Sequence, residues 1–130
     1  MGLPEAWEAY LRFRPGFAAA SDERFYPMAW LDREVAEGRV LIWWTDAAAI
    51  LAEIKVYPSG LYDLHGLLAT GRLSDIADNL IPQAEAWAHS VGCDGVLIQS
   101  REGWQRVMRG RGYETYQVSI RRPLQGRTAA

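Results

Sequence analysis

The feature that most constrains the fold is a long amphipathic helix pattern between two strand-like runs. The helix pattern covers about Ser74 to Val91, and its apolar positions are Ile76, Leu80, Ala84, Trp87 and Val91. The runs Leu61–Leu68 and Gly95–Gln99 flank it and have the composition of strands. This order predicts two parallel strands joined by a right-handed crossover. Pro82 lies inside the helix pattern, so we expect a kink or a second helical piece there.

The remaining segments predict further strands and helices. Val40–Trp44 and Ala48–Tyr57 precede the first of those runs, and the three together predict an antiparallel meander. The run Val96 to Ile98 is continuously apolar, which is typical of a strand buried on both faces. Helices are expected at residues 4–13, 27–37 and 101–109, a loop at 18–22, and a last strand at 113–120. The prediction is an α/β fold with a mostly antiparallel central sheet flanked by helices on both faces.

Length and charge exclude several classes of protein. The chain has 130 residues and a formal net charge of −2, so we expect one domain at residues 1–124 with a flexible tail at 125–130. The charge balance disfavours nucleic-acid binding. Cys93 is the only cysteine, which disfavours a disulfide and a metal site. With no signal-peptide or membrane-spanning pattern, we expect a cytoplasmic protein.

From Asp63 onward the motifs resemble those of the GCN5-related N-acetyltransferase (GNAT) superfamily. The resemblance rests on Arg72-Leu73-Ser74-Asp75-Ile76-Ala77, Asn79-Leu80-Ile81, Ala84-Glu85-Ala86-Trp87-Ala88, Gly92-Cys93, the helix Arg101–Met108 and Gly112-Tyr113. In this superfamily an Arg/Gln-x-x-Gly-x-Gly/Ala motif opens a helix that ends before a Gly-Cys-like turn. The Arg-x-Gly-Trp sequence at residues 101–104 looks like that of divergent members encoded by tailed phages and prophages.

The resemblance implies an acetyl-CoA site. Backbone amides at the start of the helix would cradle the pyrophosphate, because unpaired N–H groups and the positive end of the helix dipole face the anion. Cofactor and amine substrate would meet between the splayed strands at residues 61–68 and 95–99. The implied cofactor-binding residues are Leu67, Ala69, Arg72, Ser74, Ala77 and Arg101.

Three positions depart from the superfamily pattern. Asp75 replaces the first glycine of the motif, and its carboxylate would repel a phosphate. The alternative is an ordinary first-turn acid, with Ser74 as the helix N-cap. Met108 stands where a proton-donating tyrosine is usual, and Arg101 where an asparagine is often found. Methionine cannot donate a proton.

Other candidate chemistry lies on the predicted meander. Glu53, Asp63 and His65 could converge as a general base, because neighbouring antiparallel strands bring side chains together. The alternative is that they are polar residues on the wetter face of the sheet. Cys93 reads as a small buried hydrophobe rather than a nucleophile.

Two functions remain open from the sequence. The favoured one is a phage- or prophage-type GNAT relative with a degenerate acetyl-CoA site, which acts through a protein partner in the host cytoplasm or the virion. The alternative is an active acetyl-CoA-dependent N-acetyltransferase on an unidentified amine. The six tryptophans suggest an interface, because adjacent Trp43 and Trp44 must leave a strand on opposite faces. We therefore expect a protein partner or a homo-oligomer.

Overall fold

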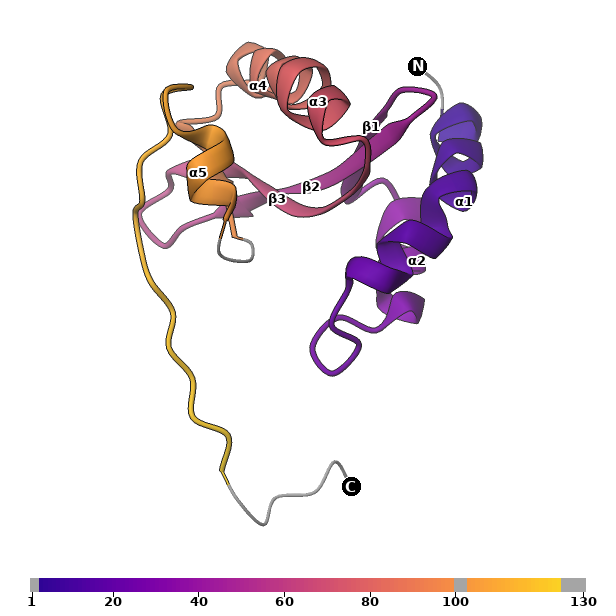
Figure 1. Cartoon of the computed structure of the whole chain (residues 1–130), viewed down its shortest axis with the longest axis horizontal. Coiled ribbons are helices and arrows are strands. Elements are labelled where there is room, and N and C mark those ends of the chain that lie inside the picture. Colours follow the sequence, from indigo (N-terminus) through magenta and orange to yellow (C-terminus); the bar gives the residue numbers. More distant parts are fainter. Residues whose placement is uncertain (1–2, 100–102, 125–130) are drawn as a thin grey trace.

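The computed structural model describes residues 3–99 and 103–124 (Figure 1). A four-stranded sheet in the order β1-β2-β3-β4 forms its centre. The strands are β1 (Val40–Trp44), β2 (Ala48–Val56), β3 (Tyr62–Gly71) and β4 (Gly95–Ile98). β1, β2 and β3 pair antiparallel, whereas β3 and β4 pair parallel through the helical crossover. The predicted mixed, mostly antiparallel sheet is confirmed.

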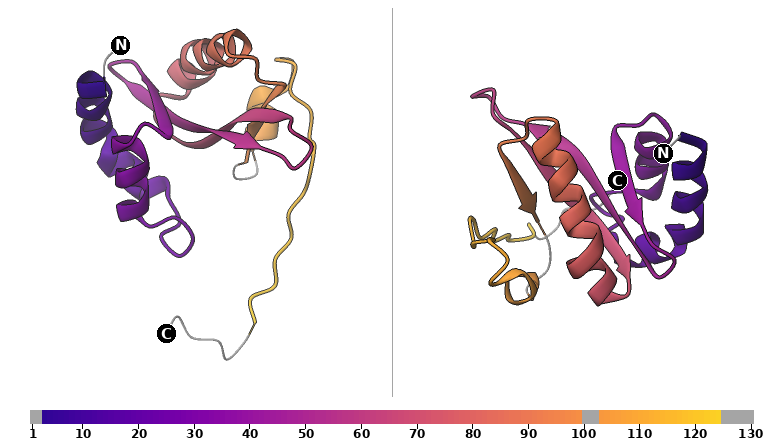
Figure 2. Two further views of the ribbon diagram at one scale, coloured as in Figure 1. Left: turned by 180° about the vertical axis from the view of Figure 1, so that it is seen from behind. Right: turned by 90° about the horizontal axis from the view of Figure 1, so that it is seen from above.

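Helices cover both faces of this sheet (Figures 1 and 2). α1 (Leu3–Ala20) and α2 (Met28–Ala36) lie on one face, and α3 (Leu73–Asp75), η1 (Ile76–Leu80) and α4 (Ile81–Ser90) lie on the other. α5 (Trp104–Met108) follows β4. Each face has its own buried core, one centred on Phe17 and Leu51 and the other on Leu64 and Leu80. Among the described helices, none combines the length and the apolar character needed to cross a bilayer.

The adjacent tryptophans of β1 pack into different cores. Trp43 is 9% exposed and meets Trp87 of α4 edge to face, with ring centroids 5.7 Å apart. Trp44 packs, partly buried, against the core under α1 and α2. Because both rings find partners inside the fold, they form no exposed aromatic patch. A protein partner therefore stays a prediction without support from these two residues.

α1 is longer than the sequence pattern predicts. The expected end near Phe13 and the expected loop at 18–22 are wrong, since the helix continues through Pro15 to Ala20. The reason is tertiary: Phe17 is fully buried and stacks on Tyr10, with ring centroids 6.0 Å apart. Burial of that ring stabilises the last turns beyond the proline.

The crossover helix is interrupted in the way that Pro82 suggests. Residues 76–80 form a π-helical turn, and regular α-helix resumes at Ile81 with Pro82 in its first turn. The Ile81 N–H bonds back to the Ile76 carbonyl with the wider spacing of a π-helix, and this irregular turn accommodates the proline that follows, which has no N–H. The prediction of a second helical piece is thus confirmed. The predicted N-cap is wrong, because Arg72 occupies that position and Ser74 lies within α3.

The carboxy-terminal part departs most from expectation. β4 is half-buried along its whole length rather than buried on both faces. The expected strand at 113–120 is extended but pairs with no described strand. α5 begins at Trp104, and its expected beginning at residues 101 and 102 lies outside the described residues. A strand needs a neighbour for its backbone groups, and none of the described residues provides one here.

Candidate functional site

The site lies where β3 and β4 separate. Their parallel pairing begins at Asp63 and Gly95 and ends at Gly66 and Ile98, whereas β3 continues to Gly71. The pairing of β2 with β3 also shifts here, because Leu51 faces Leu68 while Ala52 faces Gly66. Leu67 is the extra residue of this β-bulge and has no partner on β2. The edge of β3 beyond Gly66 is therefore not paired with β4.

Two cavities border this separation. The larger has a volume of about 560 Å³ and runs between the sheet and the face of α4, with Leu64, Ile81 and Trp104 among its lining residues. The smaller has a volume of about 100 Å³ and lies toward the α1–α2 connection, where Tyr26 and Trp30 line it. Both share the sheet residues Gly66, Leu67 and Leu68 together with Asp22 and Gln99. A ligand in each cavity would approach the other at the point where the strands diverge.

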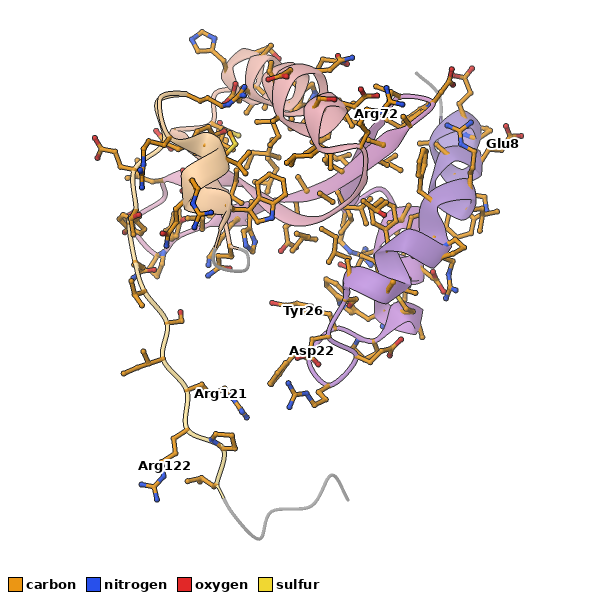
Figure 3. The ribbon with its side chains drawn as sticks, viewed as in Figure 1. Glu8, Asp22, Tyr26, Arg72, Arg121 and Arg122 are labelled. Atoms are coloured by element: carbon orange, nitrogen blue, oxygen red, sulfur yellow. The ribbon has the colours of Figure 1, made fainter. Side chains whose placement is uncertain are left out.

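The predicted cofactor residues have different positions around the larger cavity. Leu67 and Ala69 line it. Arg72 is exposed at the start of the crossover helix (Figure 3). Ser74 is also exposed, and Ala77 is buried in the π-helical turn. Arg101 lies outside the described residues.

The start of the crossover helix carries no side-chain cap. Arg72 precedes α3 with an extended backbone, and its N–H donates to the carbonyl of Ala47 at 2.9 Å. Asp75 does have a partner: its Oδ2 accepts a hydrogen bond from Thr45 Oγ1 at 2.7 Å. Thr45 Oγ1 also accepts from the N–H groups of Ala47 and Ala48, each at 3.1 Å. Asp75 thus fastens the helix start to the β1–β2 turn.

His65 and Glu53 come together as a cross-strand pair. They face each other in the β2–β3 register, and His65 Nδ1 lies 3.3 Å from Glu53 Oε2. His65 is 6% exposed and lines the smaller cavity. Its Nε2 is buried and finds no hydrogen-bond partner among the described residues. An ionised Glu53 can only accept, so it favours the tautomer with the proton on Nδ1 and a free lone pair on Nε2.

Asp63 does not join this pair. Its Oδ2 accepts from the Tyr57 hydroxyl at 2.7 Å, near the distal end of the β2–β3 hairpin. This bond, together with desolvation and the charge of Asp63, raises the pKa of Tyr57 to about 12. Of the three predicted base residues, the structure brings two into contact. The buried position of His65 also differs from the alternative expectation of a wet sheet face.

Residues near α5 offer one contact that the sequence did not suggest. Met108, at the usual tyrosine position, is buried in the core. Tyr113 donates to Glu85 Oε2 at 2.6 Å, and burial first, then this bond, raises the pKa of the phenol. Spacing alone could not reveal this pair because it joins α4 to the segment after α5. Tyr113 is therefore held as a neutral donor to α4.

Cys93 lies near the hairpin that carries Asp63, and its surroundings are those of a core residue. Cys93 is partly buried against the core, rather than fully buried as the sequence predicts. Desolvation, with the charges of Asp63 and Asp94, raises the pKa of its thiol. Within residues 3–99 and 103–124, no three His, Cys, Asp or Glu side chains gather into a group that could hold a metal ion.

Solved acetyltransferase structures share this architecture. A GCN5-related N-acetyltransferase from Ralstonia eutropha superposes with a TM-score of 0.66 at 18% identity, over 97% of this chain and 96% of the other. A ribosomal-protein-alanine N-acetyltransferase from Brucella melitensis gives a TM-score of 0.60 at 12% identity, over 90% and 95%. A predicted acetyltransferase with acetyl-CoA from Clostridium acetobutylicum gives 0.60 at 9%, over 79% and 76%.

These likenesses define the fold of the chain as GNAT-like. No protein-family model matches the sequence, and no curated protein matches it. At this level of identity the shared fold does not assign the activity. The chemical features of this fold that bear on activity are the two cavities and the Glu53–His65 pair.

Proposed function

We propose that this chain is an acetyl-CoA-dependent N-acetyltransferase in which His65, oriented by Glu53, is the general base. The observation that carries the proposal is the buried, unpartnered Nε2 of His65 beside two cavities that meet at the strand separation. A buried polar atom without a partner is uncommon in folded proteins and suggests a ligand. The solved neighbour with acetyl-CoA supports the choice of cofactor.

The described residues fit such a cofactor in three respects. The larger cavity is lined mainly by apolar side chains, such as Leu64 and Ile81, and can hold an extended acyl-carrying arm. The β3 edge beyond Gly66 offers backbone groups that an amide-containing arm could pair with. At the start of α3, uncapped amides and the exposed Arg72 could contact phosphates. Bound there, acetyl-CoA supplies an acetyl thioester.

The chain's own residues then do the remaining work of catalysis. A primary amine in the smaller cavity would lose its proton to His65 Nε2 as its nitrogen forms a bond to the acetyl carbon. Glu53 would hold the imidazole in the required tautomer and stabilise its protonated form. Met108 cannot return a proton to the departing thiolate, so that proton must come from another group or from solvent.

The test is an acetyl-transfer assay on the full chain with a panel of amines, read as thiol release. Glu53→Gln keeps the size of the side chain but presents an amide that can donate to Nδ1, which would leave the proton on Nε2. We expect its rate, and that of His65→Gln, to fall about 10²–10⁴-fold. Acetyl-CoA affinity, measured by calorimetry, should stay the same. His89→Gln, on the exposed surface of α4, is the matched control.

A second candidate function rests on Asp75 and Met108. Both stand where the superfamily has catalytic or cofactor-binding residues, which favours a degenerate phage- or prophage-type relative that acts through a protein partner. Such a protein would show no transfer and no melting-temperature shift with acetyl-CoA. If the site binds acetyl-CoA, a ligand concentration of a hundred times the dissociation constant would raise the free energy of unfolding by about 2.7 kcal/mol. The melting temperature would then rise by several degrees.

Asp75→Asn tests whether this carboxylate lies beside the phosphates of a bound cofactor. The amide oxygen can still accept the Thr45 hydroxyl, so the contact to the β1–β2 turn is kept while the charge is removed. If Asp75 lies beside the phosphates, CoA affinity should rise at least about tenfold, since a like charge near the anion is lost. Unchanged affinity in calorimetry would place the phosphates elsewhere.

A further inference from the structure

The outer edge of β4 lacks a partner among the described residues. β4 is the last strand of the sheet, and its Gly-Val-Leu-Ile sequence carries no charge. The contacts of β4 are mainly with β3 and α4, whereas α1 and α2 pack against β1 and β3. An apolar, uncharged edge of this kind readily pairs with another strand. The edge therefore needs a cover that residues 3–99 and 103–112 do not supply.

The segment at residues 113–124 has the pattern of the missing strand. It is extended, and Tyr116, Val118 and Ile120 alternate along it. These side chains are 75%, 77% and 93% exposed. Alternating apolar residues are typical of a strand with one buried face. This segment exposes all three side chains, so it has the sequence pattern of a half-buried strand but lacks the neighbouring strand that would bury one face.

The geometry of the segment directs it away from its own β4. Tyr113 is fixed to α4 through Glu85, and from there the chain leaves the body of the domain (Figures 1 and 2). Its outer part makes one cation–π contact, with Arg121 stacked 5.0 Å from the Phe25 ring centroid (Figure 3). Among the described residues, the backbone groups at 115–120 have no backbone hydrogen-bond partner. At about 3.3 Å per residue, the eleven residues after Tyr113 span roughly 36 Å, enough to reach a second molecule.

We propose that this chain forms a strand-exchanged homodimer. Residues around 115–121 of each copy would add antiparallel to the outer edge of β4 in the other. Each copy gives and accepts the same strand, so a twofold axis closes the assembly. In an antiparallel arrangement the end of the added strand lies at the start of β4. Arg121 and Arg122 of one copy would then lie near Asp94, which precedes β4 of the other, so the charges are complementary.

The experiment is sedimentation velocity of the full chain over a range of concentrations, with two matched variants. Val118→Asp places a charge on the apolar face of the added strand, whereas Ser119→Asp places it on the opposite face. We expect a dimer whose dissociation constant rises at least about 100-fold in Val118→Asp and less than about threefold in Ser119→Asp. Thermal melts of both variants at low concentration confirm that the monomer still folds.

Hydrogen exchange of the wild-type amides at 115–121 separates the other arrangements. Protection of these amides in the dimer, lost in Val118→Asp, supports strand exchange. A monomer with protected amides would show that the segment pairs with its own β4. A monomer with unprotected amides, or a dimer that Val118→Asp leaves intact, would overturn the proposal as well. None of these results depends on acetyl-CoA or on transfer activity.

Discussion

The two edges of the sheet differ in how completely the chain covers them. At the β1 edge, helices lie on both faces, and Trp43 and Trp44 each pack into a core. At the β4 edge, the strand is half-buried throughout, and the segment that follows α5 is exposed. The cavities and the unpartnered His65 nitrogen lie between these edges, where β3 leaves β4. The well-packed β1 edge thus gives the site a rigid support, whereas incomplete packing at the β4 edge leaves the cavities open.

Chain order explains part of this difference. α1 and α2 directly precede β1, and the β1–β2 turn is fastened to the helix start by Thr45 and Asp75. The cover for β4 would instead have to come from residues 113–124, after a turn in which Gly110 and Gly112 both have positive φ. The β1 edge is covered by elements that are consecutive in the chain, whereas the β4 edge depends on a pairing with residues 113–124.

The largest effect is expected from removing a ring at the covered edge. Phe17→Ala should lower the free energy of unfolding by about 3–5 kcal/mol, because the ring is fully buried and leaves a cavity. Leu11→Ala on the same helix removes an exposed side chain and should cost less than about 0.5 kcal/mol. Urea unfolding followed by tryptophan fluorescence measures both. Similar losses for the two variants would mean that α1 is not packed as described.

A smaller effect is expected at the turn that leads from β3 to the helix start. Gly71 has φ +104°, and a Cβ there would lie 2.2 Å from the Ala47 carbonyl oxygen. Gly71→Ala combines an unfavourable backbone conformation with a steric clash, and it should lower the free energy of unfolding by about 2–4 kcal/mol. Gly60→Ala is the control, since φ is +92° but no atom lies within 4 Å of the added Cβ.

The Gly60 variant should lose only the backbone part, about 1–2 kcal/mol. If Gly71→Ala also displaces the start of α3, its acetyl-CoA affinity should fall, whereas that of Gly60→Ala should not. Equal stability losses in the two variants would contradict the close approach of Ala47.

The sequence predicted the elements whose signals are local. Period-two alternation predicted β2, strand-like composition predicted β1 and β3, and the helical stripe with Pro82 predicted the two-piece crossover helix. Glu53 and His65 were paired correctly because antiparallel register brings neighbouring strands together. The end of α1 was missed because burial of Phe17, which no local pattern reports, carries the helix past Pro15.

The site could be predicted only in part, for a related reason. Leu67 and Ala69, predicted to bind the cofactor, line the larger cavity, yet the bulge that leaves Leu67 unpaired depends on the β2–β3 register and has no sequence signal. Asp63 was grouped with His65 by spacing, but Tyr57 holds it elsewhere. The strand expected at 113–120 is not formed in the structure, because a strand needs a neighbour and sequence spacing does not contain the tertiary or quaternary contacts that would provide one.

The smallest effect tests the contact that joins α1 to α2 over the covered edge. Asp32 accepts from Arg14 Nε and Arg14 Nη2, both at 2.8 Å, and from the Tyr10 hydroxyl at 2.5 Å. The Arg14 guanidinium holds the pKa of the Asp32 carboxyl below its ordinary value, against desolvation, and Tyr10 lowers it further. Asp32→Asn should therefore cost about 1–2 kcal/mol at neutral pH, a range reduced for partial exposure.

The sign of the pH dependence follows from this lowered pKa. Stabilisation by ionised Asp32 is fully present above the unfolded pKa of about 3.9 and is lost as the pH falls through the lower folded value. The difference between wild type and Asp32→Asn should thus be constant near neutrality and vanish in strong acid. Asp22→Asn is the control, because its ion pair with Arg24 is exposed and should change stability little. Urea unfolding from pH 7 down into strong acid, below the folded pKa of Asp32, measures both variants, and a difference that grows toward acid would show that Asp32 does not act as a carboxylate in this contact.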